Sequence, residues 1–462
     1  MSKTHQGARR AVALVMYTIA AYGETFTTLY NFNNGSYGPG PNPLVQGVDG
    51  NIYGTTFYGG TQNAGTIFMV TPTGEFSTLY NFCSVTNCAD GANPEAQLTV
   101  GSDGNLYGTT TFGGGAPECS LGCGTIFRFS NGTLTTLHAF MDNINGSIPQ
   151  PGLVQDVNGD FYGTTLEGGA DNYGTIFAIS PSGKFKKLLD FDFNNGEAST
   201  APVQSTKSSS LYGATNNGGA FASGEVYEVN SSGIRVLYSF PSTAEQNNPI
   251  SGLSYGRNGL LYGLTGSGIN YGTFYSITTG GSLTTLYNFT LESGTDPISL
   301  PALVLGPDGN FYGTARGGGL YGGGTIFSLT PAGVIEVLHN FAGSDGSSPV
   351  SGLTEATDGS FYGDAYQGGL NGEGTVFHIS TGLPAFVQPV PGFGAIGTNL
   401  IILGPNLTGT TSVSFNGVTA SFTVVSRTEI TVTIPIGATS GPLKIVTPAG
   451  TLSTKLAFRV LD

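Results

Sequence analysis

The apolar residues of this chain recur in three short motifs separated by glycine-rich or polar turns. The first motif is Leu/Phe/Ile-Tyr-Gly, the second is of the type Gly-Thr-Ile-Phe, and the third resembles Leu-Tyr-Asn-Phe. Seven copies of each motif are present, and the tyrosine of the first recurs every 50 to 55 residues. The repeated tyrosines are Tyr53, Tyr107, Tyr162, Tyr212, Tyr262, Tyr312 and Tyr362. Runs of this length, bounded by turn signals, predict short β-strands.

Turn signals separate the motifs at regular positions. Asp-Gly or Asn-Gly pairs such as Asp49-Gly50 precede the Tyr-Gly motif, although the fourth unit has Ser209-Ser210 there. Such pairs favour tight hairpins in which both central residues have positive φ. A second set of turns, such as Thr73-Gly74, separates the second motif from the third. Each unit is therefore predicted to form four short strands, as in a propeller blade.

The order of the motifs indicates how the repeats close. The chain begins with an isolated third motif, from Phe26 to Phe32, and the last unit ends at Gly374 to Ser380 without one. A ring closed by its own N-terminal strand hides the last sheet edge, whereas an open array would gain nothing from this order. We therefore predict an all-β fold, a seven-bladed β-propeller in which the N-terminal strand closes the last blade. Strand alternation puts both tight turns of every blade on one face, the tight-turn face. The glycine-rich loops and the crossovers between blades lie on the other, the loop face.

The C-terminal part has a different pattern. From about Leu383 the 50-residue repeat does not continue, and apolar and polar residues alternate over six or seven short runs. This pattern suits a small immunoglobulin-like β-sandwich. The predicted domains are a propeller over residues 24–382 and a β-sandwich over residues 383–462.

The first 23 residues have the pattern of a signal peptide. Lys3, Arg9 and Arg10 precede an apolar run, and Ala21-Tyr22-Gly23 offers a small-x-small cleavage site. The apolar run of eleven residues is shorter than the roughly 20 that span a bilayer, and no later segment is long enough. We expect residues 1–23 to be a signal peptide and the mature protein to be secreted, periplasmic or at the cell surface, with no transmembrane segment.

Composition indicates a folded protein, and net charge restricts the kinds of ligand that it could bind. The 75 glycines show no Gly-X-Y period, and 39% hydrophobic residues suffice for a core, so the glycines belong to turns of a folded β protein. The net charge of −14 and the lack of a basic run beyond the N-terminus argue against nucleic-acid binding. We expect a monomer that binds neutral or cationic ligands.

Four cysteines lie in two insertions of the second blade. Cys83 and Cys88 are in its crossover, and Cys119 and Cys123 are in its glycine-rich loop. Four cysteines allow three pairings, of which we favour Cys83–Cys88 and Cys119–Cys123. A zinc site of four cysteines is the alternative.

The repeat units resemble the GloVer tandem repeat of bacterial surface and secreted proteins over about residues 26 to 380. The matching residues run from Asp103-Gly104-Asn105-Leu106-Tyr107-Gly108 through Gly113-Gly114 to Gly124-Thr125-Ile126-Phe127. The C-terminal part resembles an IPT/TIG domain, through Gly404-Pro405-Asn406-Leu407 and Val413-Ser414-Phe415-Asn416-Gly417. The repeat family implies a fold but no defined activity.

Candidate functional residues are those that vary between units. His138 and His339 occupy the tyrosine position of the third motif and are interpreted as outer-strand residues, and the repeated tyrosines as packing between blades. No catalytic triad, phosphate loop or calcium loop is present, and we expect no metal and no cofactor. Near the glycine-rich loops lie tyrosines that could stack on sugar rings, namely Tyr58, Tyr173, Tyr271, Tyr321 and Tyr366.

Two classes of function remain. The first is a non-catalytic binding or scaffold protein of the cell surface or secreted matrix that recognises carbohydrate on the loop face. The second is an extracellular carbohydrate-active enzyme, a lyase or hydrolase, with Glu167, Asp171 or Asp364 as acid or base. Carboxylates that converge on the loop face would favour the enzyme.

Overall fold

The computed structural model describes residues 24–33, 41–150, 152–205, 208, 210–230, 232–242, 248–266 and 271–461. The predicted signal peptide, residues 1–23, lies outside these described residues. In the part that the structure describes, no helix has the length and apolar character needed to cross a bilayer.

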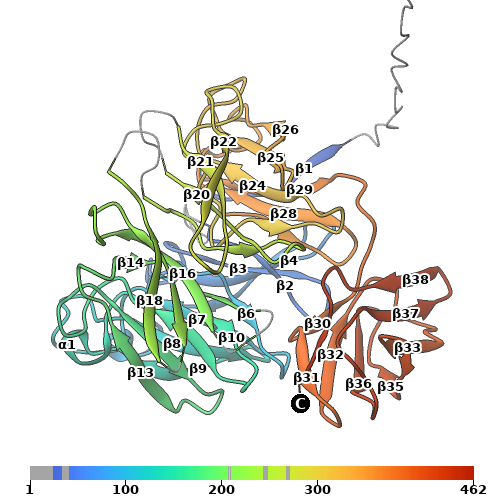
Figure 1. Cartoon of the computed structure of the whole chain (residues 1–462). Helices are drawn as coiled ribbons and strands as arrows, with labels where there is room; N and C mark the ends of the chain where they lie inside the picture. Colours follow the sequence, from blue (N-terminus) through green and yellow to red (C-terminus); the bar gives the residue numbers. More distant parts are fainter. Residues whose placement is uncertain are drawn as a thin grey trace, which may run out of the picture.

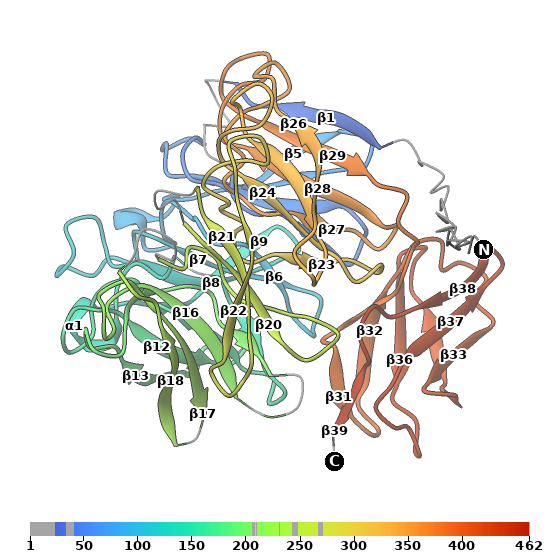
Figure 2. The same cartoon turned by 45° about the horizontal axis from the view of Figure 1, so that its top comes forward.

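Seven antiparallel sheets, one for each repeat unit, form the propeller (Figures 1 and 2). The strands of a blade are lettered a to d in sheet order, and in blade one they are β2 (Val45–Gln46), β3 (Ile52–Thr56), β4 (Thr66–Val70) and β5 (Phe76–Asn81). Those of blade two are β6 (Thr99–Val100), β7 (Leu106–Thr110), β8 (Thr125–Ser130) and β9 (Thr133–Ala139). Those of blade three are β10 (Val154–Gln155), β11 (Phe161–Thr164), β12 (Thr175–Ile179) and β13 (Phe185–Asp190). Those of blades four to six are β15 (Val203–Gln204), β16 (Leu211–Asn217), β17 (Glu225–Asn230) and β18 (Gly233–Ser239), with β14 (Glu197–Ser199) added; β19 (Ser254–Tyr255), β20 (Leu261–Thr265), β21 (Thr273–Ile277) and β22 (Leu283–Asn288); β23 (Val304–Leu305), β24 (Phe311–Ala315), β25 (Thr325–Leu329) and β26 (Ile335–Asn340). Blade seven contains β27 (Thr354–Glu355), β28 (Ser360–Ala365), β29 (Thr375–Ser380) and β1 (Thr25–Asn31). The short helices η1 (Thr86–Cys88) and α1 (Asp142–Asn145) lie in crossovers.

The N-terminal strand is the outer strand of the last blade, as predicted. β1 pairs antiparallel with β29, with Thr25 opposite Ser380 and Asn31 opposite Thr375. In Figure 1 the blue strand β1 lies beside the orange strand β29. The two ends of the propeller sequence therefore share one sheet.

Aromatic stacking joins the outer strands of neighbouring blades. His138 of blade two stacks on Phe185 of blade three with 3.8 Å between ring centroids. Tyr30 occupies the corresponding position in β1 and stacks on Phe76 of blade one at 4.0 Å. Blade seven thus contacts blade one through the same pair of positions that joins blades two and three. His339 stacks on Phe26 in the same way, at 3.8 Å, so the two histidines are outer-strand packing residues, as predicted.

Repeated hydrogen bonds explain the third motif. The N–H of its phenylalanine donates to the carbonyl of the glycine that begins the second motif, as from Phe32 to Gly374 and from Phe82 to Gly65, both at 3.0 Å. The residue before it, Asn or Asp, accepts from a backbone N–H in the glycine-rich loop of the same blade. These pairs are Thr61 to Asn81, Ala170 to Asp190, Leu320 to Asn340 and Leu370 to Asn31. The outer strand therefore holds the loop at the edge of each of these blades.

The turns before the Tyr-Gly motif differ from the prediction. Gly50 has φ +84°, but Asp49 is not in the positive-φ region. The N–H of Gly50 donates to the carbonyl of Gly47 at 3.0 Å, which makes a type I turn followed by a glycine bulge. The Asp49 carboxylate explains the difference, because it accepts hydrogen bonds from the N–H of Asn51 and the hydroxyl of Tyr53. The repeated tyrosine therefore also anchors this turn.

The C-terminal domain is an immunoglobulin-like sandwich of two four-stranded sheets. One sheet has the order β30 (Gln388–Val390), β32 (Asn399–Leu403), β36 (Glu429–Thr433), β35 (Phe422–Val424). The other has the order β34 (Val418–Thr419), β33 (Ser412–Phe415), β37 (Leu443–Thr447), β38 (Gly450–Ser453), and β31 (Phe393–Ala395) pairs with β39 (Arg459–Leu461). The core between them is aliphatic with two rings, and its fully buried members include Ile402, Phe415, Ile430, Ile445 and Phe458.

The sandwich packs on the tight-turn face of the propeller. The hydroxyl of Thr428 donates to the carbonyl of Val48 at 3.1 Å, in the first turn of blade one. The N–H of Phe386 donates to the carbonyl of Thr357 at 2.9 Å, in the corresponding turn of blade seven. Figure 2 shows the red sandwich beside the blades. The loop face is the propeller face that these contacts leave free.

Deleting residues 24–32 is expected to destabilise the propeller and cause aggregation. The deletion exposes the β29 edge and removes Phe32, which is fully buried and alone contributes about 3–5 kcal/mol. Thermal unfolding with light scattering measures both effects, and a chain that begins at Glu24 is the control. Equal melting temperature and solubility of the two chains would contradict the role of β1.

Candidate functional site

Exposed apolar side chains gather on the loop face. The glycine-rich loop of each blade joins strands b and c and is called the b–c loop. Among the described propeller residues, every large hydrophobic side chain that is exposed lies in a b–c loop or a crossover, except Val236 and Val334. The loop-face members are Tyr58, Val85, Leu121, Met141, Ile144, Phe193, Phe221, Tyr271, Leu291, Leu300, Leu320, Tyr321, Tyr366 and Leu370. The exposed apolar side chains of the propeller are therefore concentrated on one face.

The five predicted tyrosines lie on this face but do not form one cluster. Tyr321 is 63% exposed and Tyr271 is 41% exposed, and Tyr58 and Tyr366 are similar to Tyr271. Tyr173 is partly buried, because it packs against Phe193 with 5.6 Å between ring centroids. Each tyrosine comes from a different blade, and no ring contact between described residues joins two of them. They are separate side chains spread around the face.

A cavity of about 270 Å³ lies between the crossovers at the centre of the loop face. Its wall comes from six blades. It is mainly apolar, with amide and hydroxyl groups, and its lining residues are Pro43, Glu95, Ala96, Gln97, Gln150, Gly152, Leu166, Ser199, Thr200, Ala201, Asn216, Ile250, Leu300 and Pro301. None of the five tyrosines lines it. We call it the axial cavity.

Glu95 is the one ionisable side chain in the wall of the axial cavity. Its carboxylate accepts a hydrogen bond of 3.5 Å from the hydroxyl of Thr111. Burial raises the pKa of the Glu95 carboxyl, against smaller opposite effects of hydrogen bonds from Gln150 and Thr111. A carboxyl in such a wall gains more from a cationic or hydrogen-bonding ligand than one in water does.

Sequence reasoning missed this cavity although a signal exists. In most units a leucine stands directly before strand a, and the residue three positions earlier points to the axis, as for Glu95, Gln150, Ile250 and Leu300. The identity of that residue changes from blade to blade. Comparison of this position across the repeats would have identified the wall.

A second cavity continues along the axis between the innermost strands. It has a volume of about 460 Å³ and shares Gln97, Gly152, Ala201 and Pro301 with the axial cavity. Its far end is lined by Lys455 and Leu456 of the C-terminal sandwich. The sandwich therefore covers the axis at the tight-turn face.

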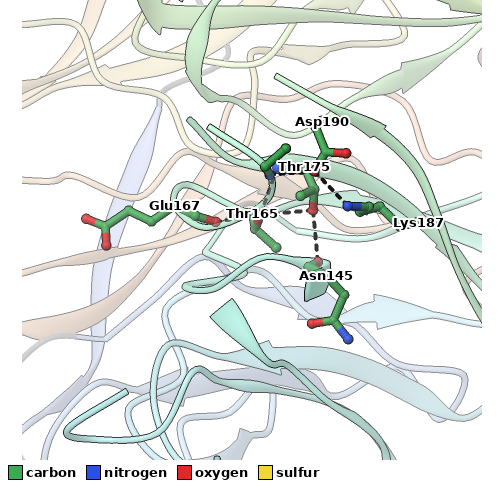
Figure 3. A network of polar contacts seen from close by, with 7 residues as sticks. Asn145, Thr165, Glu167, Thr175, Lys187 and Asp190 are labelled. Atoms are coloured by element: carbon green, nitrogen blue, oxygen red, sulfur yellow. Dashed lines mark hydrogen bonds and ion pairs between the residues drawn. The ribbon is translucent and has the colours of Figure 1, made fainter. Parts of the chain in front are cut away.

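The three carboxylates suggested for catalysis do not converge on the axial cavity. The hydroxyl of Thr165 lies 3.0 Å from both the carbonyl of Glu167 and the hydroxyl of Thr175. The Thr175 hydroxyl also lies 3.1 Å from the carbonyl of Asn145. Figure 3 shows the Glu167 carboxylate pointing away from this network. Asp171 lies in the same glycine-rich loop and does not line the cavity.

Asp364 lies inside the propeller. It is fully buried on β28, on the same side of the strand as Tyr362. Burial raises the pKa of its carboxyl well above the usual range, with a smaller opposite effect of the Ser351 side chain. A ligand on the loop face cannot reach it without unfolding of the blade.

The four cysteines form the two local disulfides that were predicted, Cys83–Cys88 and Cys119–Cys123. The zinc alternative is wrong because both pairs are oxidised. Each bond closes an insertion of blade two on the loop face. Among the described residues, no group of three or more His, Cys, Asp or Glu side chains has the arrangement of a metal site.

The comparisons with known proteins agree with the architecture. The model of the Gloeobacter/Verrucomicrobia repeat matches residues 4–207 and 198–413, and the IPT/TIG domain model matches residues 386–460. No curated protein matches.

One solved structure shows the likeness of fold at a TM-score above 0.5. The extracellular domain assigned to a hybrid two component system of B. thetaiotaomicron is 12% identical, with a TM-score of 0.51, over 96% of this chain and 60% of that one. This chain thus spans about 60% of the length of that structure. The WD40 β-propeller domain of Doa1 is 11% identical over 76% of this chain and 96% of its own, with a TM-score of 0.48. A gluconolactonase from Xanthomonas campestris is 12% identical over 79% and 91%, with a TM-score of 0.40.

Proposed function

The chain belongs to the Gloeobacter/Verrucomicrobia repeat family, and we propose that it is a non-catalytic extracellular or cell-surface protein that binds carbohydrate on its loop face. The observation that carries this proposal is the concentration of exposed apolar and aromatic side chains on that face. The opposite face is partly covered by the sandwich and otherwise consists of short turns. Only the loop face differs enough between blades to form an asymmetric site.

An extracellular location is supported by the two disulfides. Disulfides persist in oxidising compartments and are rare in the cytosol, and both pairs here close surface insertions. The leader-like pattern of residues 1–23 supports export independently.

A binding role rather than glycoside hydrolysis is supported by the single carboxyl of the axial cavity. Hydrolysis of a glycosidic bond generally uses two carboxyl groups on opposite sides of the bond. Glu95 has no carboxyl opposite it in the wall. The exposed tyrosines, in contrast, present flat apolar faces of the kind that stack on sugar rings.

Replacing both Tyr271 and Tyr321 by Ala is expected to weaken carbohydrate binding. Each stacked ring contributes on the order of 1 kcal/mol, so that loss of two lowers the affinity roughly tenfold or more. A glycan array followed by titration with the retained glycans measures the change. Val334→Ala, an exposed apolar side chain on the tight-turn face, is the matched control.

Two results would oppose the proposal. Equal glycan binding by the double variant and the wild type would remove these tyrosines from the site. Glycan cleavage that is lost in Glu167→Gln or Asp171→Asn would establish an enzyme instead.

A further inference from the structure

The loop face is strongly acidic as well as apolar. The described b–c loops and crossovers contain one basic residue, Arg316. Their acidic residues number twelve: Asp90, Glu95, Glu118, Asp142, Glu167, Asp171, Asp192, Glu197, Glu292, Asp296, Asp345 and Glu373. The other Lys and Arg residues of the described chain lie in strands, in tight turns or in the sandwich. The face therefore attracts cations toward its centre.

The axial cavity places one carboxyl where such a cation would arrive. Glu95 shares the wall of the cavity with the apolar side chains of Pro43, Leu166, Ile250 and Leu300 and with neutral amides, and no basic side chain lines it. Two of its hydrogen-bonding neighbours, Gln150 and Thr111, are uncharged. The Glu95 carboxylate thus has no ion-pair partner among the described residues, whereas the buried Glu355 has Lys455.

The size and the polar groups of the cavity restrict the ligand further. Pockets for drug-sized ligands measure about 300–1,000 Å³, so a cavity of about 270 Å³ suits a single sugar ring. Gln150 and Asn216 offer amide groups for sugar hydroxyls. Ile250 and Leu300 offer an apolar wall to the ring carbons.

We propose that the axial cavity binds the end of a cationic amino-sugar chain, with the protonated primary amine against the Glu95 carboxylate. This inference rests on the proposed carbohydrate binding and assigns the class of sugar. The terminal ring enters the cavity from the loop face, and following rings contact the exposed side chains around the mouth. The far end of the axis is covered by Lys455 and Leu456, so the loop face is the side from which a chain can enter.

Titration calorimetry of the full chain with three oligosaccharides of equal length tests the proposal. The probes are β-1,4-linked glucosamine, its N-acetylated form, and β-1,4-linked glucose. The glucosamine oligomer is expected to bind at least about tenfold more tightly than the other two, and added salt should reduce this preference.

Substitutions at Glu95 test whether its carboxylate is the group that binds the amine of the sugar. Glu95→Gln should abolish the preference for the amine, so that the glucosamine and glucose oligomers bind with similar affinity, while Glu95→Asp, which retains the charge, should keep most of the preference. Glu373→Gln, which removes a partly buried carboxylate outside the cavity, is the matched control, because Glu95 is also partly buried. Melting temperatures check that each variant is folded.

The outcomes separate this inference from the proposed function. Equal binding of all three oligosaccharides, or a preference that survives in Glu95→Gln, would overturn the inference alone. No binding of the three oligosaccharides by a chain that binds other glycans on the array would also overturn the inference alone, whereas no binding of any glycan on the array would overturn both.

Discussion

Replacing Lys455 by Met is expected to release the C-terminal sandwich from the propeller. Lys455 forms an ion pair with Glu355 of β27 and lies 4.4 Å above the ring of Phe386. The Glu355 side chain is only 1% exposed, and its second oxygen has no hydrogen-bond partner. Loss of one partner of a buried pair costs about 3–5 kcal/mol, because the other charge stays buried without compensation.

The free-energy cost of the unpaired Glu355 carboxylate cannot exceed the free energy that holds the two domains together. Undocking lets water reach the carboxylate, so the variant is expected to separate the domains before the penalty unfolds the propeller. Limited proteolysis of the segment between β29 and β30 measures this release, and so does hydrogen exchange at Phe386, whose N–H donates across the interface to the carbonyl of Thr357.

A charge-neutral pair and a surface lysine provide the controls. Glu355→Gln with Lys455→Met should lie closer to the wild type than Lys455→Met alone, because no buried charge is left unpaired. Lys444→Met removes an exposed lysine of the same domain and should have little effect. If Lys455→Met and Lys444→Met behaved alike, the ion pair would not hold the domains together.

The blades were predictable because each one repeats the same local chemistry. The third motif carries both the phenylalanine whose N–H meets the second motif and the Asn or Asp that holds the loop, so its isolated copy at Phe26–Phe32 had to complete a blade. The turn type was not predictable from Asp-Gly alone. The Asp49 carboxylate binds Asn51 and Tyr53, and this favours a bulged type I turn.

The axial cavity and the domain interface could not be predicted from the repeats, because they depend on residues that are not repeated. The cavity wall takes single residues from six blades, and its chemistry depends on Glu95, which is absent from the other copies of its position. Lys455 and Glu355 are 100 residues apart, in domains of different pattern. The tyrosines were visible in the sequence because they recur near glycine-rich loops, but their separation around the face follows from the ring of blades.

Replacing Asp364 by Thr is expected to stabilise the propeller at neutral pH. Four other blades have Thr at this position of strand b: Thr55, Thr109, Thr164 and Thr314. Thr314 donates to the carbonyl of Ser351 at 2.9 Å, across the boundary to blade seven. Neither carboxylate oxygen of Asp364 has a hydrogen bond of good geometry, and the Ser351 side chain offsets the effect of burial only in part. A buried polar group without a hydrogen bond costs about 1–3 kcal/mol.

The sign of the pH dependence distinguishes this explanation from improved packing. Burial raises the folded-state pKa of Asp364, so the unfolded chain loses its proton first as the pH rises above about 3.9. The wild type is therefore most penalised at neutral pH, and the advantage of Asp364→Thr should shrink as the pH falls toward 4. Urea unfolding of both chains at several pH values measures the difference in stability. Asp364→Asn has a similar shape but no ionisable group, so its difference in stability from the wild type should vary with pH as that of Asp364→Thr does. An advantage that does not change between pH 7 and pH 4, or a less stable variant, would show that the buried carboxyl is not the source of the penalty.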